Sequence, residues 1–444
     1  MIRKILIANR GEIAVRIIRA CRELGIETVA VYSEADADSL HTQLADESIC
    51  IGAAQSSDSY LNMERIISAT INKGADAIHP GFGFLSENSR FAELCKECNI
   101  TFIGPSWEVI EKLGNKSIAK NTMKEAGVPV IPGGDIAITD VVEGKKISEK
   151  IGFPVIIKAA LGGGGKGMRI ANTIAEFDVA FAKAQKETEM AFNDNRMYIE
   201  KFIKSPRHIE VQIIADNYGN VIHLGERECS IQRNHQKLLE EAPSSVINDE
   251  MRKRIGEVAV KAGKAAGYTS VGTIEFLLDQ NNDFYFMEMN TRIQVEHPVT
   301  EMITGIDIVK KQIQIAEGLE LGISQDEVEF RGHAIECRIN AENTQEGFRP
   351  CPGEITNLHF PGGNGIRVDS GVYCGYVIPP YYDSMIAKLI VHGKNRKEAI
   401  YKMNSALGEL IITGVDTTIG FQHEIINHPR FKKGDINIDF VEEM

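Results

Sequence analysis

The residues between Gly272 and Pro298 combine apolar, strand-like runs with a dense set of polar side chains. They read GTIEFLLDQNNDFYFMEMNTRIQVEHP. The pair Asn281-Asn282 suits a two-residue hairpin turn, because asparagine tolerates positive φ. Counting back from that turn predicts that Glu275 faces Glu288, with Cβ atoms ~4.5–5.5 Å apart. Two such carboxylates repel each other unless divalent cations lie between them, and Mg²⁺ prefers oxygen ligands of this kind.

A row of polar residues at period two follows this pair. If the strand stays extended, side chains ~6.6 Å apart share one face, namely Glu288, Asn290, Arg292, Gln294 and Glu296. Two metal ligands would then lead to an arginine suited to a planar oxyanion and to a carboxylate able to act as a general base. The row predicts a site for a nucleotide's metal beside a small anionic co-substrate. The alternative is a solvated strand face with mixed charges.

A glycine run occupies residues 162–167 and reads GGGGKG. It matches GxGxxG formally, but a strand-like segment follows it where a dinucleotide fingerprint would open a helix. We therefore interpret it as a hairpin tip whose backbone amides can approach phosphate oxygens closely. Lys158 and Lys166 add positive charge. The run predicts a glycine-rich flap over a triphosphate, with an exposed flexible turn as the alternative.

At ~100–200 residues per domain, the length of the chain suggests about three domains to position these residues. Strand and helix patterns alternate from residue 4 to about 104, beginning with a strand at 4–8, a helix at 10–24 and a strand at 27–32. This pattern is typical of a doubly wound α/β domain. Its first turn, at residues 8–13, lacks the dinucleotide fingerprint. Short strands and turns dominate from about 115 to 320, and a mixed α+β region begins near 332.

Composition narrows the class of protein. The chain has 444 residues, 43% apolar and 25% charged, with a formal net charge of −13. This is a globular mixture, and its acidity disfavours nucleic-acid and anionic-membrane partners. No window approaches the ~20 apolar residues that span a membrane. Eight scattered cysteines favour reduced thiols and a cytoplasmic location, and the Cys95–Cys98 pair lacks neighbouring ligands for zinc.

Several motifs together resemble the ATP-grasp ligases: Lys116, Lys158, the 162–167 loop, residues 200–203, Glu275, Glu288 and Asn290. Longer stretches narrow the resemblance to the biotin carboxylase family. They are HPGFGFLSEN (79–88), RHIEVQ (207–212), ERECSIQRNHQKLLEEAPS (226–244), EMNTRIQVEHPVTE (288–301) and HAIECRINAE (333–342). The resemblance covers essentially the whole chain. One departure is Phe82, where the family pattern has tyrosine; its ring can still pack, although a hydroxyl contact is lost.

The resemblance implies a fold and an activity. We expect an N-terminal doubly wound α/β domain at 1–114, an ATP-grasp domain at 115–330 with a glycine-rich lid at about 131–203, and a C-terminal α+β domain at 331–444. The implied reaction is carboxylation of biotin with ATP and bicarbonate through carboxyphosphate, a ligase reaction that forms a carbon–nitrogen bond. Since Arg338 lies beyond residue 332, the C-terminal domain must fold back onto the ATP site.

The resemblance also assigns residues to each ligand. ATP contacts are implied for Lys116, Lys158, Gly164, Gly165, Glu200, Lys201, Phe202, Ile203, His208, Gln232, His235, Glu275 and Glu288. Two Mg²⁺ or Mn²⁺ ions are implied at Glu275, Glu288 and Asn290. Bicarbonate is implied to bind Lys237, Arg292, Gln294 and the backbone of Val295, with Glu296 as its base. Biotin is implied to lie by Gly83, with Arg338 stabilising its enolate. Lys237, Arg292, Glu296 and Arg338 are thus the expected catalytic residues.

Partners are inferred in the same way. The chain shows no lysine between two methionines, as a biotin-carrying segment would have, and ends at Met444. We therefore expect the biotin carboxyl carrier protein and the carboxyltransferase to be separate chains, and a homodimer from the resemblance. Acetyl-CoA carboxylase, in fatty acid biosynthesis, is the first expectation for the complex. The alternatives are a two-subunit pyruvate or other acyl-CoA carboxylase, another ATP-grasp carboxylate ligase, and a non-catalytic ATP-binding subunit.

Overall fold

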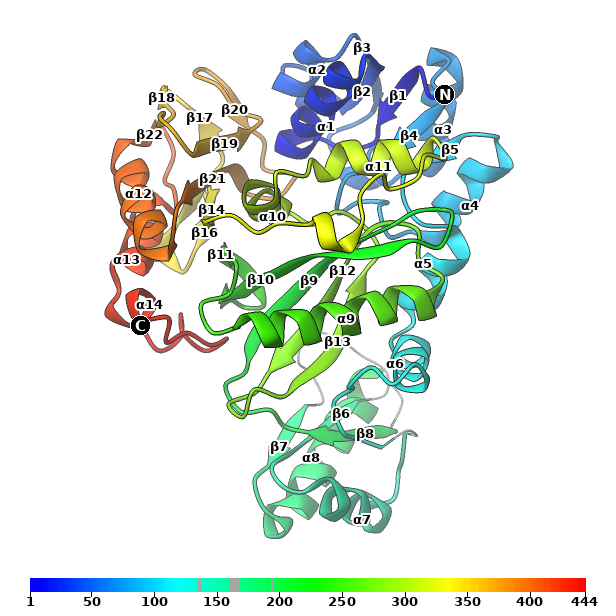
Figure 1. Cartoon of the computed structure of the whole chain (residues 1–444), viewed down its shortest axis with the longest axis vertical. Helices are drawn as coiled ribbons and strands as arrows, with labels where there is room; N and C mark the ends of the chain where they lie inside the picture. Colours follow the sequence, from blue (N-terminus) through cyan, green and yellow to red (C-terminus); the bar gives the residue numbers. More distant parts are fainter. Residues whose placement is uncertain (135–136, 160–167, 193–194) are drawn as a thin grey trace. The chain divides into compact units, whose positions relative to one another are not determined.

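The computed structural model describes residues 1–134, 137–159, 168–192 and 195–444 (Figure 1). The chain forms two compact units. The larger unit contains Met1–Val128, Arg207–Phe276 and Glu288–Met444, and the smaller contains Pro129–Pro206 and Leu277–Met287. Among the described residues, no helix has both the length and the apolar composition needed to cross a membrane.

The N-terminal part of the larger unit is a parallel sheet in the order β3-β2-β1-β4-β5. Its strands are β1 (Lys4–Ile7), β2 (Glu27–Ser33), β3 (Glu47–Gly52), β4 (Ala77–His79) and β5 (Thr101–Phe102). The connecting helices are α1 (Gly11–Leu24), α2 (Leu40–Leu44), α3 (Met63–Lys73) and α4 (Ser89–Glu97), followed by α5 (Trp107–Gly114) and α6 (Lys116–Glu125). Helix α1 buries Ile13 and Ile17 and ends at Gly25, whose φ of 72° suits glycine. The predicted doubly wound domain is confirmed.

A second sheet has eight strands in the order β13-β12-β9-β10-β11-β14-β21-β19. They are β9 (Arg207–Ala215), β10 (Val221–Arg233), β11 (Gln236–Ala242), β12 (Ser270–Leu278), β13 (Phe284–Asn290), β14 (His333–Asn340), β19 (Ile366–Ser370) and β21 (Met385–Gly393). C-terminal strand β14 pairs antiparallel with β11, and Glu336 lies opposite Glu240. This pairing makes the C-terminal region continuous with the central sheet, as the predicted folding back requires.

Helices and short strands complete the larger unit. The helices are α9 (Asp249–Ala266), α10 (His297–Thr304), α11 (Ile308–Ala316), α12 (Arg396–Glu409), α13 (Ile419–Asn427) and α14 (Pro429–Lys433). The short strands are β15 (Glu342–Asn343), β16 (Arg349–Pro350), β17 (Gly353–Glu354), β18 (Asn357–His359), β20 (Val377–Ile378) and β22 (Ile411–Thr413). Single 3₁₀ turns are η1 (Glu34–Asp36), η2 (Ser56–Asp58), η3 (Gln325–Glu327) and η4 (Thr344–Glu346). The C-terminal core contains Leu389 of β21 and Met403 of α12, and both side chains are fully buried.

In the residues that the structure describes, the smaller unit contains a three-stranded sheet in the order β7-β6-β8 and two helices. The elements are β6 (Val155–Ala159), β7 (Arg169–Ala171), β8 (Met197–Lys201), α7 (Val141–Ile151) and α8 (Ile174–Phe192). Its core contains Val155, Phe177 and Ile199, all at most 1% exposed. Strands β6 and β7 pair antiparallel, as a hairpin requires. The glycine run, with Gly164 and Gly165, lies outside the described residues.

The turn between β12 and β13 differs from the predicted two-residue turn. Asp279 N donates to Asp283 O at 2.8 Å, and Asn282 N donates to Asp279 O at 3.2 Å. Three residues, 280–282, therefore connect the strands, and Asn282 has a φ of 64°. A three-residue loop that closes on a residue with positive φ is a common hairpin connection. The predicted two-residue turn was wrong. The predicted pairing of Glu275 with Glu288 was counted from that turn, so the turn no longer supports it.

Candidate active site

Strand β9 presents His208, Glu210 and Gln212 on one face, because alternate residues of a strand point the same way. All three side chains are at most 6% exposed. Strand β10 lies between β9 and β11 and carries the buried Arg227. The other predicted residues lie against the sheet that these neighbouring strands form.

Lys237 on β11 is the centre of this group. Its Nζ lies 2.6 Å from Glu210 Oε2, 3.1 Å from Glu275 Oε1 and 2.6 Å from Glu296 Oε1. Burial lowers the pKa of Lys237, but the charges of Glu210, Glu296 and Glu275 outweigh it and hold the pKa well above its ordinary value. The ammonium is therefore charged at neutral pH and faces three carboxylates.

Glu275 on β12 accepts hydrogen bonds from several of these residues. Its Oε1 accepts from Asn290 Nδ2 and from Gln294 Nε2, both at 2.8 Å. Its Oε2 lies 2.9 Å from His208 Nε2. Burial raises the pKa of Glu275, but the charge of Lys237 and the contact with His208 outweigh it, so the pKa lies well below its ordinary value. Glu275 is an ionised carboxylate among donors.

Glu288 on β13 has the opposite electrostatic environment. Burial and the negative charge of Glu275 raise its pKa, and the positive charge of Lys116 opposes them. A divalent cation between Glu275 and Glu288 would remove this repulsion. The carboxylate oxygens of these two residues and the amide oxygen of Asn290 match the donor preference of Mg²⁺ or Mn²⁺. The residues present therefore fit the implied metal ions.

The predicted extended row from Glu288 to Glu296 is wrong in its backbone. Strand β13 ends at Asn290, the chain bends, and α10 begins at His297. The side chains still converge, because the bend turns Gln294 toward Glu275 and Glu296 toward Lys237. A strand would have separated these side chains along its length, whereas the bent segment gathers them around one ammonium.

Arg292 lies on this bent segment and is held by three acceptors. Its Nε donates to Glu87 Oε2 at 3.0 Å, its Nη2 to Asn290 Oδ1 at 3.0 Å, and its Nη1 to Ile293 O at 3.2 Å. The backbone of Val295 is anchored through its carbonyl, which accepts from Lys388 Nζ at 2.8 Å. Arg292 and Val295, two of the four groups predicted to bind bicarbonate, are thus fixed in place by other residues.

Arg338 reaches the same group from β14. Its Nη2 lies 3.0 Å from Glu296 Oε2, and its Nε donates to Glu240 Oε1 at 2.7 Å. Burial raises the pKa of Glu296, but Lys237, Arg338 and Arg227 hold it well below its ordinary value. Glu296 therefore contacts two of the other expected catalytic residues, Lys237 and Arg338. The fourth, Arg292, is linked to them through Asn290 and Glu275.

The predicted ATP contacts fall in both units. In the smaller unit, Lys158 Nζ lies 2.7 Å from Glu200 Oε2. The Lys201 ammonium donates to the carbonyls of Gly152 and Phe153, at 3.0 and 2.9 Å, so it fixes the local backbone. The side chains of the next two residues, Phe202 and Ile203, are half-buried.

In the larger unit, Lys116 is the exposed first residue of α6, and Gln232 lies on β10 opposite Lys237. His235 is exposed in a two-residue turn between β10 and β11, where Asn234 and His235 have φ of 50° and 63°. No contact between His235 and the Lys237 group is present in the described part of the chain.

Gly83, the predicted biotin contact, lies in the loop after β4 with a φ of 69°. The same loop supplies Glu87, whose carboxylate accepts from Arg292 and from the backbone of Thr291. The neighbouring Phe82 packs against the apolar core beneath β1 and α1, so its ring does find the expected packing. Through Glu87, the loop thus contacts the segment that carries Arg292.

Sequence reasoning missed Glu210, Glu87, Glu240 and Arg227. A signal for Glu210 was present, because it lies two residues after His208 on a strand and so shares its face. Arg227 and Glu240 lie within the 226–244 motif that carried the family resemblance, but their spacing did not indicate that their side chains would face the site. Glu87 depends on a contact across 205 residues of sequence, which no local pattern indicates.

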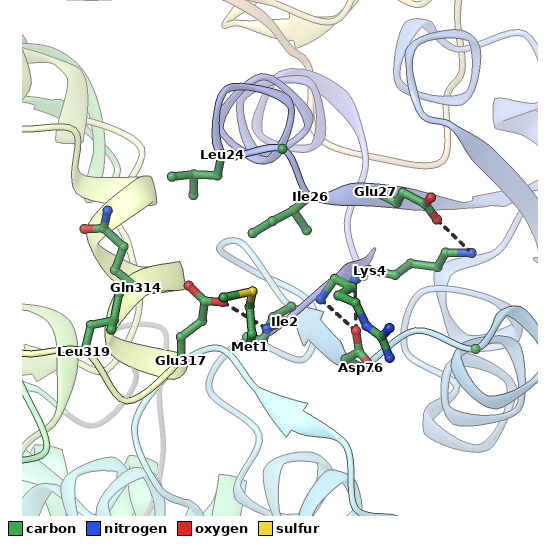
Figure 2. Close-up of a pocket in the computed structure, with 13 residues that line it drawn as sticks. Met1, Ile2, Lys4, Leu24, Ile26, Glu27, Asp76, Gln314, Glu317 and Leu319 are labelled. Carbon is green, nitrogen blue, oxygen red and sulfur yellow. Dashed lines mark hydrogen bonds and ion pairs between the residues drawn. The ribbon is translucent and has the colours of Figure 1, made fainter.

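A separate pocket of about 660 Å³ lies beside the N-terminal strand (Figure 2). None of the predicted site residues that the structure describes lines it. Asp76 accepts from the backbone amides of Arg3 and Lys4 at 2.8 and 3.0 Å, and Glu317 accepts from the amide of Ile2 at 2.9 Å. These carboxylates serve to hold the start of the chain.

Three family models match the chain. The model described as "Biotin carboxylase, N-terminal domain" matches residues 1–110, and "Biotin carboxylase C-terminal domain" matches residues 336–443. "Carbamoyl-phosphate synthase L chain, ATP binding domain" matches residues 115–324. Together they account for nearly the whole sequence.

Individual relatives agree with these models. "Biotin carboxylase 1" of Bacillus subtilis is 59% identical, covering 100% of this chain and 98% of the relative. A pyruvate carboxylase subunit of Methanothermobacter thermautotrophicus is 56% identical, covering 100% and 90%. A solved biotin carboxylase domain dimer of the Hydrogenobacter thermophilus 2-oxoglutarate carboxylase, in complex with MgADP, ADP and bicarbonate, is 52% identical with a TM-score of 0.91, covering 100% and 98%.

Proposed function

Because the chain belongs to the biotin carboxylase family, we propose that it uses ATP and bicarbonate to carboxylate biotin on a carrier protein. It is a ligase that forms a carbon–nitrogen bond. The observation that carries the proposal is the position of Lys237, whose ammonium contacts Glu210, Glu275 and Glu296 while Arg338 contacts the same Glu296. This arrangement sets donors for an anion beside an ionised base.

Bicarbonate would take the position where these donors converge. Lys237, Arg292, Gln294 and the backbone N–H of Val295 supply its hydrogen-bond donors. Glu296 is ionised, since three cations lower its pKa, and it can therefore accept the bicarbonate proton. To do so, its ion pair with Lys237 must open, so that Lys237 turns its charge toward the bound anion.

The chemistry balances at each step. Glu296 takes the proton of bicarbonate, and a carbonate oxygen then attacks the γ-phosphorus of ATP. The bond to the β,γ-bridging oxygen breaks, releasing ADP and leaving carboxyphosphate. Carboxyphosphate separates into CO₂ and phosphate. That phosphate takes the N1′ proton of biotin, and N1′ bonds to CO₂. Arg338 stabilises the negative oxygen of the biotin enolate, and Gly83 borders the ring.

The nucleotide requires both ATP-binding residues and metal ions. The proposed ATP contacts are the thirteen residues named from the family resemblance, including Gly164 and Gly165. Glu275, Glu288 and Asn290 would hold Mg²⁺ or Mn²⁺. When bound there, these ions would supply positive charge against the phosphate oxygens and offset the repulsion between Glu275 and Glu288.

The domain limits remain part of the proposal: 1–114, 115–330 with the lid at about 131–203, and 331–444. We propose that the carrier protein and the carboxyltransferase are separate chains and that the protein is a homodimer. The solved Hydrogenobacter thermophilus relative is described as a dimer, which supports this state. A cytoplasmic location, favoured by the scattered cysteines, also belongs to the proposal.

The final acceptor defines the complex. We propose acetyl-CoA carboxylase first; the similar Bacillus subtilis protein is named "Biotin carboxylase 1", a name that mentions no other acceptor. A two-subunit pyruvate carboxylase is the second candidate, supported by the name of the Methanothermobacter relative. Assaying the complex purified from its source with acetyl-CoA and with pyruvate distinguishes them, because only the correct acceptor consumes carboxybiotin.

The first experiment measures ADP release by the purified chain with Mg²⁺ and bicarbonate, with and without free biotin. Stimulation of ADP release by biotin is the expected result. Bicarbonate-dependent release that neither free biotin nor a biotinylated carrier protein stimulates would indicate another ATP-grasp ligase. Binding of ATP without any turnover would indicate a non-catalytic role. Light scattering in the same buffer tests the homodimer.

A further inference from the structure

Arg227, near the middle of β10, is fully buried and contacts Gln294, one of the residues that we propose to bind bicarbonate. Its guanidinium has five N–H groups, and five side-chain acceptors surround it. Nε donates to Glu210 Oε1 at 2.5 Å. Nη1 donates to Gln212 Oε1 and Thr300 Oγ1, at 2.8 and 3.0 Å. Nη2 donates to Gln294 Oε1 and Thr273 Oγ1, at 2.7 and 3.1 Å.

We propose that Arg227 is a positioning residue that orients both Gln294 and Lys237 toward bicarbonate. The inference rests on the proposed function. Arg227 touches neither substrate nor reacting atoms; it acts through the two side chains that do. Nothing in the family resemblance assigned it this role.

The first part of the argument concerns the amide of Gln294. An amide has one accepting end and one donating end, and arginine can only donate. Arg227 therefore attracts Oε1 of Gln294 and turns Nε2 to the opposite side. There Nε2 donates to Glu275 Oε1 at 2.8 Å, on the side where the other anion-binding groups gather. If the amide were reversed, its oxygen would face the bicarbonate and repel it.

The second part concerns Lys237. Glu210 is fully buried and uses its two oxygens for two different cations. Oε1 accepts from Arg227, and Oε2 accepts from Lys237 at 2.6 Å. Arg227 thus fixes the rotation of the carboxylate that holds the Lys237 ammonium. Two donors to bicarbonate, one amide and one ammonium, depend on a single buried guanidinium.

A lysine could not replace this arginine. The planar guanidinium directs its donors along three edges at once, whereas an ammonium has three donors on one point. Four of the five acceptors are neutral, so charge compensation alone does not explain the arrangement. The positions of the acceptors match a guanidinium that locks several side chains together.

The test compares Arg227→Lys with a matched Arg252→Lys control. Arg252 on α9 forms a fork to Glu226, next to Arg227 in sequence, with distances of 2.9 and 3.0 Å. Within the described part of the chain, it contacts no proposed site residue. We expect Arg227→Lys to raise the KM for bicarbonate by about tenfold and to change the KM for MgATP by less than about twofold. The control should change neither KM.

A double variant distinguishes action through Gln294 from a general structural effect. If Arg227 acts by orienting this amide, Arg227→Lys should add less than about threefold to the bicarbonate KM of Gln294→Ala. Full multiplication of the two single effects would overturn the proposal. So would an equal rise of both KM values in Arg227→Lys, or a bicarbonate KM unchanged from the control.

A milder variant keeps the test open if Arg227→Lys does not fold. Thr273→Val preserves side-chain shape and removes one of the two acceptors that hold the Nη2 edge. It should raise the KM for bicarbonate by about two- to threefold without affecting that for MgATP, and an unchanged value overturns the proposal. Absence of bicarbonate-dependent ADP release in the unsubstituted chain overturns the proposed function and this inference together. Normal release there, with an unchanged KM in the variants, overturns this inference alone.

Discussion

Lys237 Nζ lies 2.6 Å from Glu296 Oε1, so the cation that we assign to bicarbonate binding is paired with the carboxylate that we assign as its base. Arg338 contacts the other oxygen of Glu296 at 3.0 Å. The base is therefore charged and held in place before substrate enters. In the proposed mechanism, an arriving bicarbonate competes for Lys237, and this competition links anion binding to release of the base.

Replacing Glu296 by glutamine removes the base while keeping the shape of the side chain. We expect the kcat of bicarbonate-dependent ADP release to fall about 100-fold or more, because general-base catalysis contributes about that much. MgATP affinity, measured by titration calorimetry, should stay within about twofold, since a base for bicarbonate adds little to nucleotide binding. A kcat near that of the unsubstituted chain would show that another group removes the proton.

Glu336→Gln is the matched control. Glu336 is also buried, two residues from Arg338 on β14, and burial raises its pKa well above the ordinary value. Burial therefore favours the uncharged form of this side chain, and glutamine is uncharged and of similar shape. ADP release should be retained in this variant.

Replacing Arg338 by methionine tests the proposed enolate step. The change removes the positive charge beside Glu240 and Glu296 but retains side-chain bulk. We expect the biotin-stimulated rate to fall by about 100-fold, as for loss of a donor to a developing oxyanion. MgATP binding should be unaffected. Equal loss of nucleotide affinity would contradict a role confined to biotin.

Replacing Glu288 by glutamine tests the metal assignment. The substitution removes one proposed oxygen ligand and its charge, so the Mg²⁺ concentration for half-maximal ADP release should rise about tenfold or more. Asp283→Asn, at the exposed tip of the same hairpin, is the control and should leave the Mg²⁺ dependence unchanged. Identical Mg²⁺ curves for Glu288→Gln and the unsubstituted chain would refute the ligand role.

Glu241 should make stability depend on acid pH. Burial raises the pKa of Glu241, but hydrogen bonds from His333 and Arg396 outweigh it and lower the pKa from 4.5 to about 2. A folded pKa below the unfolded value stabilises the fold above about pH 4.5, and that stability is lost as the pH falls toward 2. The shift corresponds to about 3 kcal/mol.

Urea unfolding from pH 7 to pH 2.5 measures this contribution. Glu241→Gln should lower the free energy of unfolding at pH 7 and flatten its decline below about pH 4.5. Glu409→Gln is the control, because Glu409 pairs with His359 at an exposed site and should change stability by less than about 1 kcal/mol. An acid limb of unchanged slope in Glu241→Gln would contradict the prediction.

Much of the architecture could be predicted from local patterns. Periodicity from residue 4 to about 104 indicated the parallel N-terminal sheet, because strand and helix periods differ and Gly25 marks a helix end. Long motifs around Lys237, Glu288 and Arg338 indicated the family. Periodicity and motifs both depend on residues that are close in sequence, so they can be recognised without knowledge of distant contacts.

Local patterns misjudged the backbone after Asn290. Alternation of polar residues predicted a continuing strand, yet the chain bends where β13 ends and α10 begins. The turn at 280–282 also differed from the predicted two-residue turn. After Asn290, contacts from distant residues hold the backbone, such as the bonds from Thr291 and Arg292 to Glu87.

The sequence by itself determined the family, the order of the elements and the kinds of side chain available for the chemistry. Only the tertiary structure decided how they meet. Pairing of β14 with β11 brought Arg338 to Glu296, and five buried acceptors placed Arg227 behind Gln294. The physical reason is that strand pairing and burial of charge depend on groups far apart in sequence, whose mutual positions are set only when the sheet and its core form together.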